Sequence, residues 1–202
     1  MDTEFEAKFY PVDKDKFREK LKSVGAKLTI PERKMVRVIA DRQANNFLNK
    51  SDYIRVRNEG NVIRLSYKRT ANESGKLSDQ KEIDVEVSDY YKTVELLKLI
   101  GVKFNKIQET LREEWLYKGA QIAIDTWPGL ETYSEIEAGS EWEVKSFAHD
   151  LGLNWEGRII TTAAEVYAKV YGMSIEEVNR KISNITFDNN PFEGLTKKWK
   201  GD

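Results

Sequence analysis

Apolar and polar residues alternate with a period of two over the first two thirds of the chain. The pattern begins in Glu4-Phe5-Glu6-Ala7-Lys8, where the apolar residues share one face and the charged residues share the other. This alternation predicts eight strands, at residues 2–9, 33–41, 52–58, 61–70, 80–87, 107–117, 120–126 and 132–138. Several of these strands therefore combine one apolar face with one densely charged face.

Helical periodicity and capping residues predict helices between and after the strands. The first three end at Gly25, Gly101 and Gly152, and Asp13, Ser88 or Asp89, and Ser140 stand at their starts. Two further helices, near 162–171 and 174–184, begin at the capping boxes Thr162/Glu165 and Ser174/Glu177. Residues 71–79 are predicted to form a polar hairpin loop.

An antiparallel sheet of many strands can bury its polar face only by closing on itself. We therefore predict an α+β fold, in which a closed antiparallel eight-stranded β-barrel forms a tunnel with a polar lumen and helices pack outside. Residues 1–172 would make the tunnel domain. Residues 173–202 would form a helical extension, whose tail from 185 onward docks on the body or on a partner.

The charged faces are of two kinds. Acidic alternation occurs in Glu82-Ile83-Asp84-Val85-Glu86 and in Glu135-Ile136-Glu137, whereas Arg55 and Arg57 make one strand basic. Arg64, Ser66 and Lys68 make the next strand basic in the same way. Either these faces meet water, or they converge on something charged.

Composition narrows the class of protein. The 202 residues include 33 basic and 34 acidic side chains, a net charge of -1, which argues against a dedicated nucleic-acid or membrane-surface protein. There are no cysteines, and the N-terminus lacks a signal-peptide pattern, so we expect a soluble, cytoplasmic protein, either a monomer or a homodimer. No nucleophile-elbow, P-loop or Rossmann motif occurs.

Clustered carboxylates beside clustered Lys and Arg residues suit a polyanion bound together with a divalent metal. Oxygen ligands without His or Cys favour Mg²⁺ or Mn²⁺. Arginine forks and lysine ammonium groups match phosphate oxygens. The predicted lumen is thus suited to a phosphate chain.

Six short motifs, in order, resemble those of the CYTH domain family, the triphosphate tunnel metalloenzymes. They are Glu4-x-Glu6-x-Lys8, Tyr53-Ile54-Arg55-Val56-Arg57, Leu65-Ser66-Tyr67-Lys68, Glu82-Ile83-Asp84 followed by Arg112, Asp125 to Leu130, and Glu135-Ile136-Glu137. The resemblance covers about residues 2–171. This family includes class IV adenylyl cyclases, thiamine triphosphatases and inorganic triphosphatases.

The resemblance implies roles for individual residues. It implies metal binding by Glu4, Glu6, Glu135 and Glu137, with Asp125 and Glu82 nearby, and a catalytic set of Glu4, Glu6, Lys8, Glu135 and Glu137. It implies that Lys8, Arg55, Arg57, Lys68 and Arg112 bind the triphosphate.

The chain departs from the family pattern at several positions. Residues 37–41 stand where many members have D-x-Y-F-D, so a tyrosine is missing and Arg37 becomes an additional candidate phosphate ligand. Thr110 stands where a lysine often precedes the equivalent of Arg112, and Gln80 or Lys81 stands where an arginine is usual. Met1-Asp2-Thr3 replaces the His-Phe pair of many class IV cyclases.

These observations favour a metal-dependent enzyme that hydrolyses a small-molecule triphosphate, with no nucleic acid or membrane as partner. Inorganic, nucleoside and thiamine triphosphate all remain open as substrates. Two alternatives remain: a class IV adenylyl cyclase that makes cyclic AMP from ATP, and a non-catalytic module that binds nucleotide or polyphosphate.

Other conspicuous residues receive structural interpretations. Glu86 and Glu114 are expected at the tunnel rim or in ion pairs, and His149 is expected to be exposed. Trp127 is interpreted as a packing anchor before Pro128, although it could also stack on a ligand. The residues Trp115, Trp142 and Trp155 are expected in the core.

Overall fold

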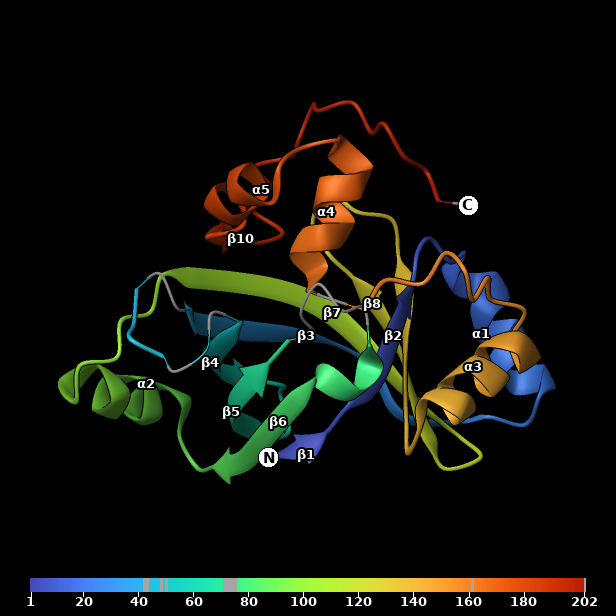
Figure 1. The fold of residues 1–202 in the computed structure, drawn as a ribbon, viewed down its shortest axis with the longest axis horizontal. Coiled ribbons are helices and arrows are strands. Elements are labelled where there is room, and N and C mark those ends of the chain that lie inside the picture. The colour runs from blue at the N-terminus through green and yellow to red at the C-terminus, as the bar shows by residue number, and fades with distance from the viewer. Residues whose placement is uncertain (42–43, 48, 50, 71–75, 161, 202) are drawn as a thin grey trace.

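A computed structural model describes residues 1–41, 44–47, 49, 51–70, 76–160 and 162–201 (Figure 1). Its strands are β1 (Asp2–Thr3), β2 (Phe5–Phe9), β3 (Lys27–Asp41), β4 (Asp52–Asn58), β5 (Ile63–Arg69), β6 (Lys81–Val87), β7 (Lys106–Tyr117), β8 (Ala120–Thr126), β9 (Tyr133–Ala138) and β10 (Asn184–Ile185). Its helices are α1 (Lys14–Ser23), α2 (Tyr90–Leu99), α3 (Glu141–Asp150), α4 (Ala163–Tyr171) and α5 (Ile175–Lys181), with a short 3-10 turn at Leu77–Asp79. Most of the predicted hairpin loop at 71–79 lies outside the described residues.

The sheet is an antiparallel, nearly closed barrel. Its strand order is β1-β6-β5-β4-β3-β7-β8-β9-β2, and β10 adds to β7 in parallel. The first and last strands of this path are consecutive in the chain, since β1 pairs with β6 and β2 pairs with β9 on either side of Glu4. The prediction of eight strands and full closure is therefore slightly wrong: the strand predicted at 2–9 is divided into two, which gives nine along this path.

Strand β3 is longer than the sequence predicted, because it begins at Lys27 rather than at residue 33. Its pairing with β7 shifts register between Leu28 and Ile30 and again between Ile30 and Arg33. Pro31 lies within this irregular stretch and has no N–H to donate to a ladder. The shifts break the alternation on which the prediction depended.

Helices pack on the apolar outer face of the barrel. Phe17 and Leu21 of α1 join Val144 and Phe147 of α3 in one core cluster, which also contains Trp115 of β7. On the other side α2 packs on β3 and β4, where its residues Val94 and Leu97 contact Val38 and Val56. The hydrophobic core therefore lies between the barrel and the surrounding helices, and not inside the lumen.

The structure tests the tryptophan assignments separately. Trp115 is buried and Trp155 is partly buried against the same cluster. Trp142 is 75% exposed, so its prediction as a core residue is wrong. It lies two residues before the buried Val144, and a two-residue step turns a helix by roughly 200°, to the opposite side.

Predicted caps are present at most helix starts. The side chains of Asp13, Asp89 and Ser140 accept hydrogen bonds from backbone amides, and Ser174 forms the full capping box with Glu177. The box predicted at Thr162 does not form, because the Glu165 amide donates to the Thr162 carbonyl instead of to its hydroxyl.

Helices α4 and α5 and the tail pack together at one side of the barrel, beside β7 (Figure 1). Phe192 stacks between Tyr167 and Tyr171, with ring centroids 4.4 and 4.7 Å away. Trp199 stacks on Tyr10 at 5.2 Å, so the tail reaches back to the end of β2. The proposed domain boundary after residue 172 stays a prediction. No helix in the described part of the chain combines the length and apolarity needed to cross a bilayer.

We expect Phe192→Ala to lower the free energy of unfolding by about 3–5 kcal/mol, because it removes a buried aromatic ring and leaves a cavity. Phe192 is only 2% exposed, whereas Phe187 in the same tail is 39% exposed. Phe187→Ala is therefore the matched control and should cost much less. Urea denaturation measures both values, and equal losses would show that the tail does not anchor through Phe192.

Candidate functional site

The barrel encloses a cavity of about 580 Å³. Polar side chains from the inward faces of the strands line it, together with residues at the start of α4 and in α5. All of the residues predicted for the site line this cavity except Asp125, which is buried behind Arg112. The cavity therefore collects side chains from almost every predicted motif.

Strand register explains how residues far apart in sequence meet in the lumen. In the β2–β9 ladder, Glu6 lies opposite Glu137 and Lys8 lies opposite Glu135. Because alternate residues of a strand face the same side, all four side chains enter the lumen together. The two glutamates of each Glu-x-Glu motif must be two residues apart for both to face the lumen, because successive residues of a strand point to opposite sides.

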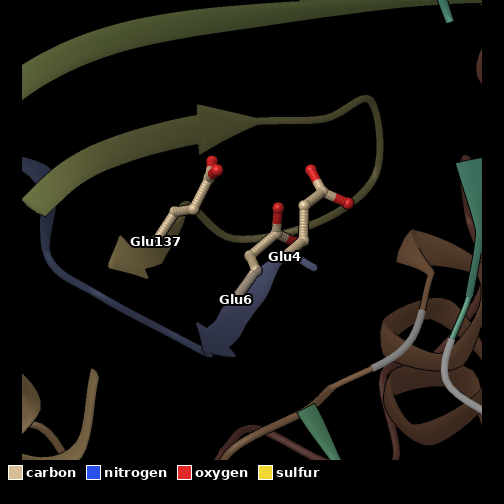
Figure 2. Close-up of side chains that lie close together, drawn as sticks. All are labelled: Glu4, Glu6 and Glu137. Carbon is tan, nitrogen blue, oxygen red and sulfur yellow. The ribbon is translucent and has the colours of Figure 1, made fainter. Parts of the chain in front are cut away.

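Glu4, Glu6 and Glu137 form an acidic trio. One carboxylate oxygen from each lies within 4.8 Å of the others. Figure 2 shows the three carboxylates projecting to the same side of their strands. Burial, together with a hydrogen bond to Glu82, raises the pKa of Glu4 to about 8. Burial and the neighbouring Glu6 likewise raise the pKa of Glu137.

The acidic trio could hold a divalent metal ion. Carboxylate oxygens are hard ligands, and three of them converging within one ion's reach match the preference of Mg²⁺ or Mn²⁺. Burial is the main cause of the raised pKa values of Glu4 and Glu137, and the negative charge of Glu6 adds to both, so a nearby cation would favour the ionised carboxylates. This donor set fits the predicted metal.

Glu135 and Asp125 lie outside the trio, in a row of ion pairs. Lys8 contacts both Glu6 and Glu135, the latter at 3.4 Å. Arg112 donates from Nε to Asp125 at 2.8 Å and from a terminal nitrogen to Glu135. Burial alone would raise the pKa of Glu135, but Arg112 and Lys8 outweigh it and hold that pKa below its ordinary value. In this geometry the two carboxylates orient cations.

The cations of β4 and β5 occupy the opposite wall. Lys68 bridges Glu4 and Glu82, at 2.9 Å from each, and Arg55 contacts Glu82 at 3.2 Å. The Nε of Arg55 is buried and has no hydrogen-bond partner among the described residues. A buried donor without an acceptor is costly, so this guanidinium is prepared for an additional anionic oxygen.

Arg37 is held without any ion pair among the residues that the structure describes. It donates to the Thr110 hydroxyl and lies over the Trp127 ring, 4.9 Å from the centroid. Burial and the nearby Arg57 lower the pKa of Arg37 to about 9. Trp127 is buried in the core, as its interpretation as a packing anchor predicted, and also supports this guanidinium.

Among the cavity residues that the sequence analysis did not assign to the site, Glu59 and Tyr133 continue recognised strand patterns. Glu59 contacts Arg57 at 2.6 Å and both Arg33 and Arg64 at 3.3 Å, so one carboxylate holds three arginines. Tyr133 lines the cavity two residues before Glu135. Both continue an alternation already recognised, Arg55-x-Arg57-x-Glu59 and Tyr133-x-Glu135-x-Glu137, and extending each pattern by one step would have found them.

The remaining predictions hold where contacts test them. Glu114 pairs with Arg33 at 2.7 Å, and Glu86 pairs with Arg64 at 3.5 Å. His149 is exposed on α3. Glu114 thus lines the cavity in an ion pair, as predicted, whereas Glu86 and His149 lie outside the cavity lining.

The family model of the CYTH domain matches residues 2–161. The chain belongs to the CYTH domain family. This match covers most of the chain and confirms the resemblance inferred from the motifs. No curated protein matches the sequence.

Several solved structures share the fold. A protein from Pyrococcus horikoshii OT3 has a TM-score of 0.64 at 22% identity, covering 79% of this chain and 96% of the other. A proposed adenylate cyclase from Vibrio parahaemolyticus has a TM-score of 0.70 at 11% identity, covering 83% and 98%. A proposed adenylyl cyclase from Hippeastrum, reported to have a dominant triphosphatase activity, has a TM-score of 0.53 at 14% identity, covering 86% and 97%.

We expect the metal-free protein to lose stability as the pH rises from about 5 to 8, partly through Glu4. The pKa of Glu4 is about 8 in the fold against an ordinary 4.5, so in this window the folded protein keeps a proton that the unfolded chain has released. Stability due to this proton disappears as the pH rises. Melting temperatures in EDTA should therefore fall less steeply for Glu4→Gln than for the wild type. Glu95→Gln, on the exposed side of α2, should keep the wild-type slope, and identical slopes for all three proteins would contradict the role of Glu4.

Proposed function

We propose that the protein is a Mg²⁺- or Mn²⁺-dependent enzyme that hydrolyses a triphosphate. The observation that carries this proposal is the arrangement within one cavity of three convergent carboxylates and several buried cations, two of which have a donor with no partner among the described residues. Carboxylates supply a metal site, and the unpaired guanidinium groups supply a phosphate site. We also propose that the protein is cytoplasmic, because a sequence without cysteine is compatible with a reducing compartment.

A bound metal would neutralise phosphate charge and lower the pKa of a water molecule. Glu4, Glu6 and Glu137 would hold it. Glu135 holds Lys8 and Arg112 in place, so that both ammonium and guanidinium groups are ready to bind phosphate oxygens without rearrangement. Such preorganised charges stabilise the leaving phosphate.

The basic wall would bind the phosphate chain along its length. Arg55, Arg57 and Lys68 face the cavity from β4 and β5, and Arg37 faces it from β3. Each of these side chains is fixed by a carboxylate or an aromatic ring, which limits the entropy lost on binding. Substrate binding thus requires little movement of the wall.

Cyclisation of ATP is the second candidate function, and the fold shared with proposed adenylate cyclases favours it. A cyclase must also bind the nucleoside so that its 3′ oxygen reaches the α-phosphate. The residues that match the family here bind phosphate and metal, which favours hydrolysis. The triphosphatase activity reported for the Hippeastrum relative points the same way.

Purified protein should release phosphate from inorganic triphosphate or a nucleoside triphosphate, lose this activity in EDTA and regain it with Mg²⁺ or Mn²⁺. Glu6→Gln and Glu137→Gln should raise the metal concentration for half-maximal activity by at least about tenfold, because each removes one charged ligand. Glu95→Gln should leave it unchanged. Full activity in excess EDTA would contradict the metal site. If the protein converts ATP mainly to cyclic AMP, the hydrolase assignment is wrong and the cyclase assignment takes its place. Binding of triphosphate without turnover would indicate a non-catalytic binding module.

Lys8→Ala, Arg57→Ala and Lys68→Ala should each weaken triphosphate binding by about tenfold or more, since each removes a charge-assisted contact. Thermal shift provides the measurement: triphosphate should raise the melting temperature of the wild type more than that of any of these variants. Lys22→Ala, on the exposed side of α1, is the control and should match the wild type. Equal ligand-induced shifts in all the proteins would place the phosphate site elsewhere.

A further inference from the structure

Helix α2 is apolar on both of its faces. On the inward face, Val94 and Leu97 are buried against the barrel. On the outward face, Leu96 is 60% exposed and Leu99 is 82% exposed, and Ile100 at the C-cap is 72% exposed. A helix that is apolar all round is normally buried on all sides. The described part of the chain therefore leaves a second apolar face of α2 uncovered.

The outward apolar residues form a stripe along the helix. Leu96, Leu99 and Ile100 follow the spacing i, i+3, i+4, which makes them neighbours on the helix surface. Tyr91, 81% exposed, lies nearer the start of the helix, and its ring packs edge-on against Tyr90 with centroids 5.3 Å apart. We call Tyr91, Leu96, Leu99 and Ile100 the α2 stripe.

An apolar outward face is not a general property of the helices around this barrel. Helix α1 also buries two apolar residues, Phe17 and Leu21, but its outward positions carry charged residues such as Lys16 and Glu19. On α3, Trp142 is one exposed aromatic residue, and single exposed apolar residues are common on protein surfaces. A stripe of several large apolar residues on one helix is instead typical of an interaction site.

The exposed area of the stripe is sufficient for an interface between two copies of the chain. The exposed fractions of its residues correspond to on the order of 500 Å² per chain. Two copies would bury about 1,000 Å² in total, the lower limit for a specific interface, before any polar rim is counted. Ile83 and Val85, both half-exposed, lie on β6, the strand that leads into α2 (Figure 1). They can extend the same interface.

The charges around the stripe suit pairing with a second copy. Lys92 and Glu95 are both exposed and lie three residues apart on α2. Two antiparallel α2 helices related by a two-fold axis midway between these positions place Lys92 of each copy opposite Glu95 of the other. The same arrangement places Tyr91 of each copy opposite Leu96 of the other. Opposite charges and apolar groups thus meet their complements.

We propose that a second copy of this chain covers the α2 stripe, so that the protein is a homodimer whose α2 helices pack antiparallel across a two-fold axis. The cavity lining includes no α2 residue among those that the structure describes. Each subunit therefore keeps its own tunnel, and the dimer does not depend on the proposed enzymatic function.

Sedimentation equilibrium over about 1–100 µM protein tests the dimer. The wild type should show twice the mass of one chain at the upper concentrations, because an interface of this size gives a dissociation constant in the micromolar range. Leu96→Glu and Leu99→Glu should each raise that constant by at least about tenfold, since each places two uncompensated charges in one interface. Trp142→Glu, an equally exposed position on α3, is the matched control and should leave the constant unchanged.

Cross-linking tests the same interface without placing a charge in it. The natural chain has no cysteine, so a single introduced cysteine can be linked only to the same position of another copy. Lys92→Cys lies close to the proposed axis and should give a covalent dimer with a short bismaleimide linker. Lys22→Cys, on the exposed side of α1, is the control and should remain a single chain under the same conditions.

Each alternative outcome would overturn the proposal. A wild type that is monomeric at about 100 µM would leave the stripe to a different partner. A dimer that neither glutamate variant weakens, or that Trp142→Glu weakens equally, would use another face. Equal cross-linking of Lys92→Cys and Lys22→Cys would show only random collisions. Phosphate release measured on wild-type protein and on Leu96→Glu keeps the two proposals apart: its absence from both would contradict the enzyme and leave the dimer intact.

Discussion

Pairing of the N-terminal strand with both ends of the sheet is the constraint on which the rest of the structure depends. β1 is hydrogen-bonded to β6, β2 is hydrogen-bonded to β9, and the backbone N–H of Glu4 between them donates to Gln80. Without this seam the sheet would be an open, curved layer, and its charged face would be in contact with water. With the seam, the same face encloses a lumen, in which charges interact more strongly than in water because the effective dielectric constant is lower.

The seam also determines where the acidic groups lie. Glu4 stands at the break between the two short strands and Glu6 at the second residue of β2, so the closing segment itself contributes two members of the acidic trio. The cations around them balance the negative charge of the lumen. Lys8, Lys68 and Arg112 each contact two carboxylates, which keeps the lumen compatible with folding before any ligand arrives. Charges of one sign alone would repel one another and oppose closure.

Much of this architecture could be predicted from alternation in the sequence, because a closed barrel imposes the same period on every strand. The strands, the helix caps at Asp13, Asp89 and Ser174, and the inward direction of Glu6 and Glu137 all followed from local pattern. Partner choice could not be predicted. Whether Glu135 approaches a metal or an arginine depends on how the registers of β7, β8 and β9 align, because they bring Arg112 of β7 across β8 to Glu135. The early start of β3 was hidden for the same reason, since its bulges near Pro31 are stabilised by β7 and leave no local signal.

The two strands of the seam lie near opposite ends of the barrel sequence, and this separation has a consequence for synthesis and folding. β2 emerges from the ribosome first, but its partner β9 follows only after every other long strand has been made. Loop-closure entropy makes such a distant pairing slow, so the seam is expected to form last, as a clasp on an almost finished sheet. Until then the future lumen is an open polar face, and its dense charge discourages incomplete chains from associating with one another during translation.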